Sequence, residues 1–219
     1  IRYLHASEPI EVPEWRQSAS SNILEGMAAL FQTTGMTETA QSTVELAYKL
    51  DSNWYDQWQR GINARQQARK FLDLGQWNES HVAYARAIES FAHADHPLAD
   101  EYTCYAYFRL GEIAEAQGDN SQAIEYYTQG IWASPQHSDF SRPVNLLFAA
   151  NGSIDEVDDY LTRVRRGGPQ DDPYLWSYSA GILDQLGARE IALQVLGETP
   201  EALVETQIIQ NVRAQLDEE

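Results

Sequence analysis

The stretch from Cys104 to His137 reads CYAYFRLGEIAEAQGDNSQAIEYYTQGIWASPQH. Its apolar and small residues recur at spacings of three and four, which places them along one side of a helix. Gly118 interrupts this pattern, and the polar pair Asp119-Asn120 follows it at once. Glycine suits the left-handed conformation at the end of a helix, and Asp and Asn suit the start of the next one. The stretch therefore predicts two antiparallel helices joined by a tight turn.

The same pattern occurs five times along the chain, each time around a glycine. These glycines are separated by 40, 43, 34 and 35 residues, and they are Gly35, Gly75, Gly118, Gly152 and Gly187. Small residues predominate seven positions before each glycine and five positions after it, which lets two helices approach closely. Large residues predominate four positions before, and these are Phe31, Phe71, Phe148 and Leu183, with Ala114 as the exception. Polar residues that we expect to start the second helix follow four of the glycines, and they are Thr37, Asn78, Asp119 with Asn120, and Ser153. A fixed register repeated five times predicts a repeat protein.

These motifs resemble the tetratricopeptide repeat family. The stretch that begins at Cys104 has Tyr107, Leu110-Gly111, Ala123, Tyr127 and Pro135 at places that match the family pattern of about 34 residues. It departs from that pattern at Ala114, where Tyr is usual, and at Gly130, where Ala is usual. The resemblance implies an all-α fold, an α-α superhelix of about five antiparallel helix pairs that ends in a C-terminal capping helix.

The register divides the chain into three parts. We expect an extended arm or linker over residues 1–20, the repeat array over 21–206, and a capping helix with an acidic tail over 200–219. The expected repeats are 21–54, 61–94, 104–137, 138–171 and 173–206. Two interruptions, Tyr55–Arg60 and Asp95–Thr103, separate the first three repeats. Trp54, Tyr55 and Trp58 indicate an early start of a longer helix, His96-Pro97 predicts a helix end, and Leu203, Ile208, Val212 and Leu216 are expected on the buried face of the capping helix.

The chain has a formal charge of -18. Such a field repels phosphate backbones and anionic lipid, so we expect no nucleic-acid partner and no binding to a membrane surface. No apolar run approaches the roughly 20 residues that cross a bilayer, so we expect no membrane insertion. The chain starts Ile1-Arg2-Tyr3, without an initiator Met or a hydrophobic signal region. We therefore expect a processed chain or part of a longer one, and the compartment stays open.

No arrangement typical of an enzyme is present. The sequence contains no nucleophile elbow, no phosphate-binding loop and no zinc-protease helix, so we expect no catalytic residues and no cofactor. His93, Asp95, His96, Asp100 and Glu101 could hold a metal ion, but a solvated loop is the preferred interpretation and no metal site is expected. Cys104 is the single cysteine, and we interpret it as a packed thiol rather than a reactive thiolate at a helix start.

Two charged stretches have alternative interpretations. Arg163, Arg165 and Arg166 precede Gly167-Gly168; they can offset a helix dipole or contact an anion or acidic peptide. Residues 155–159 contain four acidic residues, which we interpret as a solvated helix face rather than as paired catalytic carboxylates.

The resemblance also implies where a partner binds. In this family the first helix of each pair lines a concave groove that accepts an extended peptide or a helix. The matching positions here are Arg65, Arg69, Leu72, Tyr105, Phe108, Arg109, Glu112, Arg142, Leu146 and Tyr174. Some members hold a partner's terminal carboxylate with a Lys/Asn clamp; Arg65 and Arg69 occupy two of its places, but the Asn is absent, and Asp139 and Pro143 cannot complete it.

We therefore predict a non-catalytic scaffold that binds a protein or peptide with acidic and apolar side chains in the groove. Two alternatives remain. The array could associate with itself as a homo-oligomer, supported by Trp15, Trp54, Tyr55 and Trp58. It could also be the regulatory or docking appendage of a larger membrane protein or enzyme.

Overall fold

The computed structural model describes residues 14–50, 54–94 and 96–218. Every regular element in these ranges is a helix. In chain order they are α1 (Glu14–Thr33), α2 (Thr37–Leu50), α3 (Trp54–Asp73), α4 (Trp77–Ala92), α5 (Ala99–Ala116), α6 (Asn120–Ala133), the short 3₁₀ helix η2 (Pro135–His137), α7 (Ser141–Asn151), α8 (Ile154–Gly167), α9 (Pro173–Gln185), α10 (Arg189–Gly197), α11 (Glu201–Val204) and α12 (Gln207–Glu218). The predicted all-α class is confirmed.

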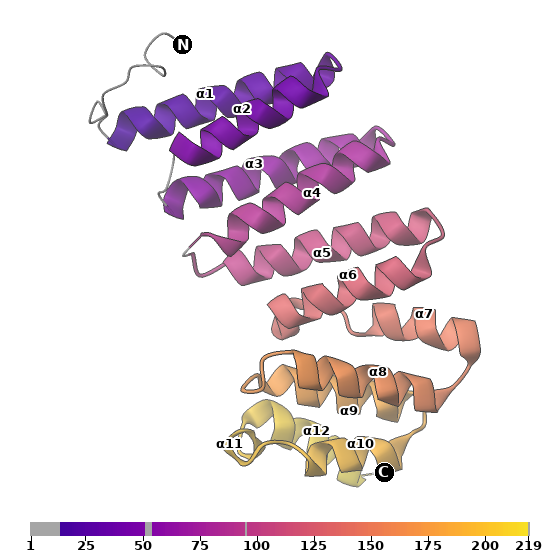
Figure 1. The fold of residues 1–219 in the computed structure, drawn as a ribbon. Coiled ribbons are helices and arrows are strands. Elements are labelled where there is room, and N and C mark those ends of the chain that lie inside the picture. The colour runs from indigo at the N-terminus through magenta and orange to yellow at the C-terminus, as the bar shows by residue number, and fades with distance from the viewer. Residues whose placement is uncertain (1–13, 51–53, 95, 219) are drawn as a thin grey trace.

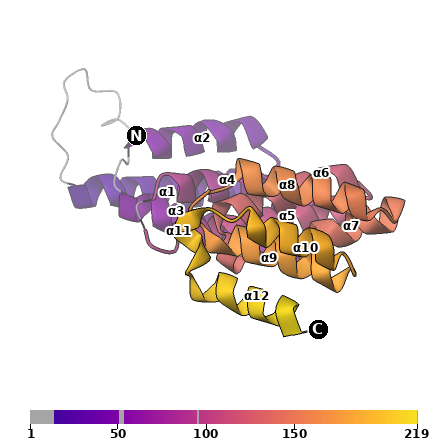
Figure 2. The ribbon, with the colours of Figure 1, turned by 90° about the horizontal axis from the view of Figure 1, so that it is seen from below.

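The helices form antiparallel hairpins that stack in chain order (Figure 1). The pairs are α1/α2, α3/α4, α5/α6, α7/α8 and α9/α10, and their internal turns lie mostly along one edge of the array. Seen along the stacking direction, α2 and α12 lie on opposite sides of the array (Figure 2). The molecule is therefore a solenoid of helix pairs, as the repeat register predicts.

All five register glycines have the left-handed conformation. Their φ angles lie between +63° at Gly152 and +80° at Gly118 and Gly187. No other residue in the described ranges has a positive φ. Each glycine ends the first helix of a hairpin, so the sequence register locates every hairpin turn.

The starts of the second helices agree with the sequence in part. Asp119 accepts a hydrogen bond from the Gln122 N–H at 3.0 Å, and Ser153 accepts one from the Glu156 N–H at 3.4 Å. These side chains cap α6 and α8 as predicted. Asn78 does not cap α4, because that helix starts one residue earlier and Gln76 precedes it without a side-chain cap.

The interruptions between repeats lengthen helices rather than forming long loops. The helix α3 starts at Trp54, as the aromatic cluster predicts, and runs for 20 residues. The helix α5 starts at Ala99, so residues 99–103, expected within an interruption, belong to its first turns. The helix α1 starts at Glu14, so residues 14–20 are helical rather than part of an extended arm; residues 1–13 lie outside the described ranges.

The hydrophobic core is divided along the array. One cluster runs through the C-terminal half and includes Ile131 of α6, Leu161 of α8, Leu183 of α9 and Ile209 of α12. Smaller clusters lie under α3, α4 and α5, such as the one around Tyr84. Neighbouring hairpins therefore complete each other's core, as in other repeat proteins.

The C-terminal cap is two helices rather than one. The chain turns at Glu205 and Thr206, and the Thr206 hydroxyl donates to the Leu203 carbonyl at 2.6 Å. As a result Ile209 is fully buried, whereas Ile208, expected on the buried face, is only partly covered. Leu203 and Leu216 are buried as predicted.

None of the helices in the described ranges has the length and apolar character needed to cross a membrane.

Candidate partner-binding groove

A cavity of about 400 Å³ lies where α3, α4 and α5 meet the connection after α6. We call it the arginine compartment. Its lining residues are Arg65, Arg69, Tyr84, Tyr105, Phe108, Arg109, Glu112, His137 and Asp139. Six of these were predicted from the resemblance, namely Arg65, Arg69, Tyr105, Phe108, Arg109 and Glu112.

Helix periodicity brings these side chains to one surface. Arg65 and Arg69 are four residues apart on α3, and Phe108 and Glu112 are four apart on α5. Side chains at this spacing lie above one another on the same helix face. Because α3 and α5 belong to successive hairpins, both stripes face the same cavity.

Glu112 is the centre of an ion-pair network at one side of the cavity. Its carboxylate pairs with Arg109, one turn away on α5, and with Arg142 of α7 at 3.1 Å. Arg142 also lies 3.3 Å from the Glu115 carboxylate. Burial lowers the pKa of Arg142, but Tyr127, Glu112 and Glu115 more than offset this and raise it. The charges of Arg109 and Arg142 are thus compensated within the molecule.

Arg65 and Arg69 are not compensated in this way. Among the residues that the structure describes, neither guanidinium pairs with a carboxylate. The Arg65 guanidinium lies 4.6 Å from the centre of the Tyr102 ring, and such stacking holds the group while its N–H edges stay available. Two cationic groups therefore line the cavity without an ion pair of their own among the described residues, although Glu112 and Asp139 line the same cavity.

Tyr84 forms the floor below these arginines. It is buried, and burial raises the pKa of its hydroxyl, while the nearby charges of Arg109, Arg65 and Arg69 lower it. Burial is the larger effect. The Tyr84 hydroxyl therefore keeps its proton at neutral pH.

The other rim contains Tyr105, Glu101 and His137. Burial and a hydrogen bond to Glu101 raise the pKa of Tyr105. His137 Nε2 lies 3.7 Å from the Glu101 carboxylate, and its Nδ1 lies 2.9 Å from the Ser134 hydroxyl. Tyr105 keeps 39% of its surface exposed, so an aromatic face is open to solvent beside the arginines.

The remaining predicted residues lie elsewhere. Leu72 and Leu146 pack against interior clusters. Arg142 reaches the cavity wall only through Glu112. Tyr174 packs against Tyr178 on α9, with ring centres 5.4 Å apart, and does not line the arginine compartment.

Three lining residues were not predicted: Tyr84, His137 and Asp139. Tyr84 occupies a core position of α4 and lines the cavity although it is only 1% exposed. His137 and Asp139 lie in the connection between hairpins, where no helical period predicts the direction of a side chain. The sequence feature that could have indicated them is their position directly before the first helix of the next hairpin.

The other sequence candidates have structural roles or lie apart. His96 stacks on Trp58 at 3.7 Å between ring centres, and His93 Nδ1 lies 2.8 Å from the Glu89 carbonyl. Asp95 lies outside the described residues. Among the described residues, no three His, Cys, Asp or Glu side chains are grouped to hold a metal ion.

Cys104 lies inside α5 rather than at a helix start, and it is fully buried. Burial, with a smaller effect of Glu101, raises the pKa of its thiol to about 12. The thiol is therefore protonated at neutral pH, which agrees with a packed side chain.

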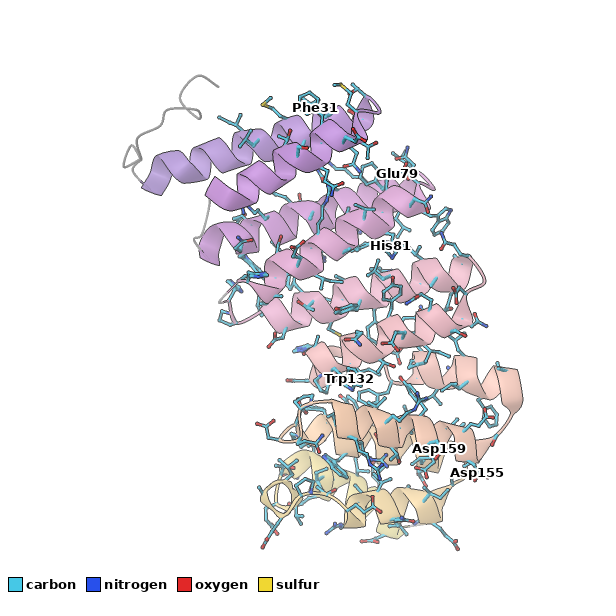
Figure 3. All side chains as sticks on the ribbon, viewed as in Figure 1. Phe31, Glu79, His81, Trp132, Asp155 and Asp159 are labelled. Atoms are coloured by element: carbon cyan, nitrogen blue, oxygen red, sulfur yellow. The ribbon has the colours of Figure 1, made fainter. Side chains whose placement is uncertain are left out.

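The three arginines of α8 lie in different environments and do not form one binding site. Arg165 is only 4% exposed; it donates to the Thr162 hydroxyl at 2.8 Å and lies 3.9 Å from Asp158. Arg163 and Arg166 are exposed beside Trp132, which donates to the Val164 carbonyl at 3.0 Å. Asp155 and Asp159 lie on the exposed face of α8 (Figure 3).

No protein-family model matches this chain. No curated protein matches it in sequence. A solved structure titled as the functional characterization of Pseudomonas aeruginosa pilF is similar over 91% of this chain and 99% of its own, with 12% identity and a TM-score of 0.28. At these values the similarity supports no inference about this chain. The array of helical hairpins is seen in the structure of this chain itself (Figure 1). Membership of the tetratricopeptide repeat family stays a prediction.

Proposed function

We propose that this chain is a non-catalytic scaffold that holds an extended segment of a partner protein in the groove containing the arginine compartment. One observation carries the proposal. Arg65 and Arg69 face a cavity without a carboxylate partner in a molecule whose formal charge is -18. A guanidinium binds a carboxylate through paired, charge-assisted hydrogen bonds. The chemistry of the site therefore favours an acidic side chain.

The aromatic neighbours support a peptide rather than a free anion. Tyr105 and Phe108 line the same cavity, and arginine beside aromatic residues is typical of the energetic centre of protein interfaces. The cavity of about 400 Å³ is open on one side and has room for a few side chains.

Selection from a library of displayed peptides tests this proposal. The library is selected on the wild-type chain, and binding of enriched peptides is measured by fluorescence polarisation. We expect enriched peptides to contain Asp or Glu, and their binding to weaken at least about tenfold in the Arg65→Glu/Arg69→Glu variant. The Arg163→Glu/Arg166→Glu variant has the same charge change on another face and should bind normally. Equal binding by both variants and the wild type would remove the groove assignment.

A second candidate, self-association, is favoured by the outer face of α1. Ile23 and Leu30 are 64% and 66% exposed and lie two turns apart, with Gly26 between them. Trp58, expected at such a contact, is instead buried against Phe91 and Tyr102, and the side chains of Trp15, Trp54 and Tyr55 are outside the described set. Sedimentation velocity over a range of concentrations, with Ile23→Glu/Leu30→Glu as the comparison, distinguishes a dimer from a monomeric scaffold.

A further inference from the structure

A second cavity, of about 300 Å³, neighbours the arginine compartment and shares the lining residue Asp139 with it. We call it the Gly181 compartment. It lies between the start of α7, α9 and α12, and Asp139 lines both cavities. Its walls are mainly apolar, from Phe140, Tyr178, Ile182 and Val212, with Ser141 and Gln185 among the polar lining residues. The two cavities are therefore neighbouring sites of different chemistry.

Gly181 lines the second cavity and has open space beside it. It lies in the middle of α9, and a Cβ atom built on it meets nothing within 4 Å. Glycine inside a helix costs roughly 1 kcal/mol relative to alanine. The helix glycines Gly61, Gly111 and Gly130 lie against aromatic rings that leave no room for a side chain. No packing contact of this chain requires Gly181 to be glycine, and the open space beside it is part of the cavity.

Asp139 gives the groove a direction. Its carboxylate accepts hydrogen bonds from the Ser141 N–H, at 3.0 Å, and from the Ser141 hydroxyl. The Asp139 charge opposes an acidic residue in either cavity, and only the arginine compartment contains cationic groups, Arg65 and Arg69, that can offset it. The uncompensated arginines lie on α3, whereas the apolar walls come from Phe140, directly before α7, and from α9 and α12. An acidic residue thus fits one side of Asp139 and an apolar residue the other.

We propose that the groove recognises a bipartite segment, with an acidic residue held by Arg65 and Arg69 and a bulky apolar side chain placed in the Gly181 compartment. The inference rests on the proposed function and specifies its partner. Tyr178 and Phe140, whose ring centres are 5.4 Å apart in an edge-to-face arrangement, form the surface that receives the apolar group. Ser141 and Gln185 offer hydrogen bonds to the backbone of the segment.

Labelled synthetic peptides of about ten residues, long enough to span roughly 33 Å when extended, test this proposal. Each peptide contains an Asp-Glu pair and one Leu at a varied distance from it, in both chain orders. A matched set has Ser in place of Leu. Binding is measured by fluorescence polarisation to the wild type, Gly181→Leu, Gly181→Ala and Arg65→Glu/Arg69→Glu. Circular dichroism and thermal unfolding confirm that each variant is folded.

We expect the best Leu peptide to bind at least about tenfold more tightly than its Ser counterpart, because a buried leucine adds this much or more. Gly181→Leu fills the cavity and should remove that difference while leaving the Ser peptide unchanged. Gly181→Ala should keep most of it. A Leu advantage that survives in Gly181→Leu, or a Ser peptide weakened equally by that variant, would overturn the bipartite site. No binding of any acidic peptide to the wild type, or binding unaffected by Arg65→Glu/Arg69→Glu, would instead contradict the proposed function.

Discussion

Glycines inside the helices of this chain serve two different physical needs. At Gly111, an added Cβ would overlap the ring of Tyr127, and at Gly130 it would come within 2.7 Å of the Phe108 ring. Tyr127 is fully buried, and its hydroxyl binds Glu115, so the ring has little freedom to move. These glycines allow close helix packing, whereas Gly181 leaves space unfilled.

This contrast predicts that replacing glycine by alanine changes the free energy of unfolding in opposite directions at Gly111 and Gly181. We expect Gly111→Ala to lower the free energy of unfolding by about 1 to 3 kcal/mol, because overpacking outweighs the gain in helix propensity. Gly181→Ala, with open space around it, should raise stability by up to about 1 kcal/mol. Urea unfolding followed by circular dichroism measures both. Equal stability of the two variants would show that the α5–α6 contact has more freedom than the packing indicates.

The buried thiol of Cys104 gives a second prediction at this scale. Its pKa in the folded chain is raised to about 12, whereas an unfolded cysteine has a pKa of about 8.5. The folded state thus holds the proton more tightly, and stability from this group is lost as pH rises above about 8.5. At that pH we expect Ellman's reagent to react at least about a hundredfold more slowly with the native chain than with the chain in urea. Rapid native reaction would place the thiol at the surface.

The side chain that caps the start of α9 makes the stability of the chain depend on pH. Asp172 caps α9 by accepting the Tyr174 N–H at 2.8 Å. Burial raises the pKa of Asp172, and this hydrogen bond only partly lowers it. A carboxyl with a raised pKa binds its proton more tightly in the folded state, so its contribution to stability falls as pH rises from about 4 toward the folded pKa.

Asp172→Asn should remove this loss and keep the cap, because Asn is an equally good N-cap residue. We expect the variant to match the wild type near pH 4 and to exceed its stability above pH 6. Thermal unfolding from pH 4 to pH 7 provides the comparison. A variant less stable than the wild type at pH 7 would mean that the ionised cap contributes more than its burial costs.

The docking of α12 can be tested with adjacent residues. Ile209 is fully buried and Ile208 only partly. Ile209→Ala should lower the free energy of unfolding by about 2 to 5 kcal/mol, as for other large-to-small core changes, and Ile208→Ala by clearly less. Denaturant unfolding of both variants shows which residue of α12 faces the core. A larger loss of stability in Ile208→Ala than in Ile209→Ala would mean that the face expected from the sequence is the buried one.

The sequence predicts turns better than helix starts. The register glycines locate every hairpin turn because only glycine adopts the left-handed conformation without strain. The starts at Glu14 and Ala99 lie before the repeat boundaries, since residues outside the repeat pattern simply extend the helix. The turn at Glu205 and Thr206 divides the cap and changes its helical phase, which moves Ile209 rather than Ile208 to the core.

The candidate binding site is formed by several hairpins together. Its residues could be predicted from the sequence where they lie in the repeat pattern, and could not where they lie outside it. Arg65, Phe108 and Glu112 could be placed because successive first helices present equivalent positions to one surface. His137 and Asp139 could not, because they lie in an irregular connection whose path depends on the hairpins before and after it. The Gly181 compartment also requires α12, whose position depends on the turn before it.

Stability should also vary along the array. In α1 and α2 the buried apolar residues that the structure describes are the small Ala28 and Ala40, and a long hydrogen bond of 3.5 Å joins Gln32 to Arg86 of α4. The C-terminal half instead shares one continuous cluster from α6 to α12. In a repeat array each unit is stabilised mainly by its neighbours.

We therefore expect the first hairpin to open before the rest of the molecule. Hydrogen exchange followed by mass spectrometry should show amides of α1 and α2 exchanging well before those of α8 and α9, because the first hairpin packs against a neighbouring hairpin on one side only (Figure 1). Low urea should accelerate exchange in α9 while exchange in α1 changes little, since only the former requires extensive exposure of core.

An acidic peptide bound in the groove should protect α3 and α5 without protecting α1. Uniform protection along the chain would mean that the array unfolds as one cooperative unit and that the divided core does not set its stability.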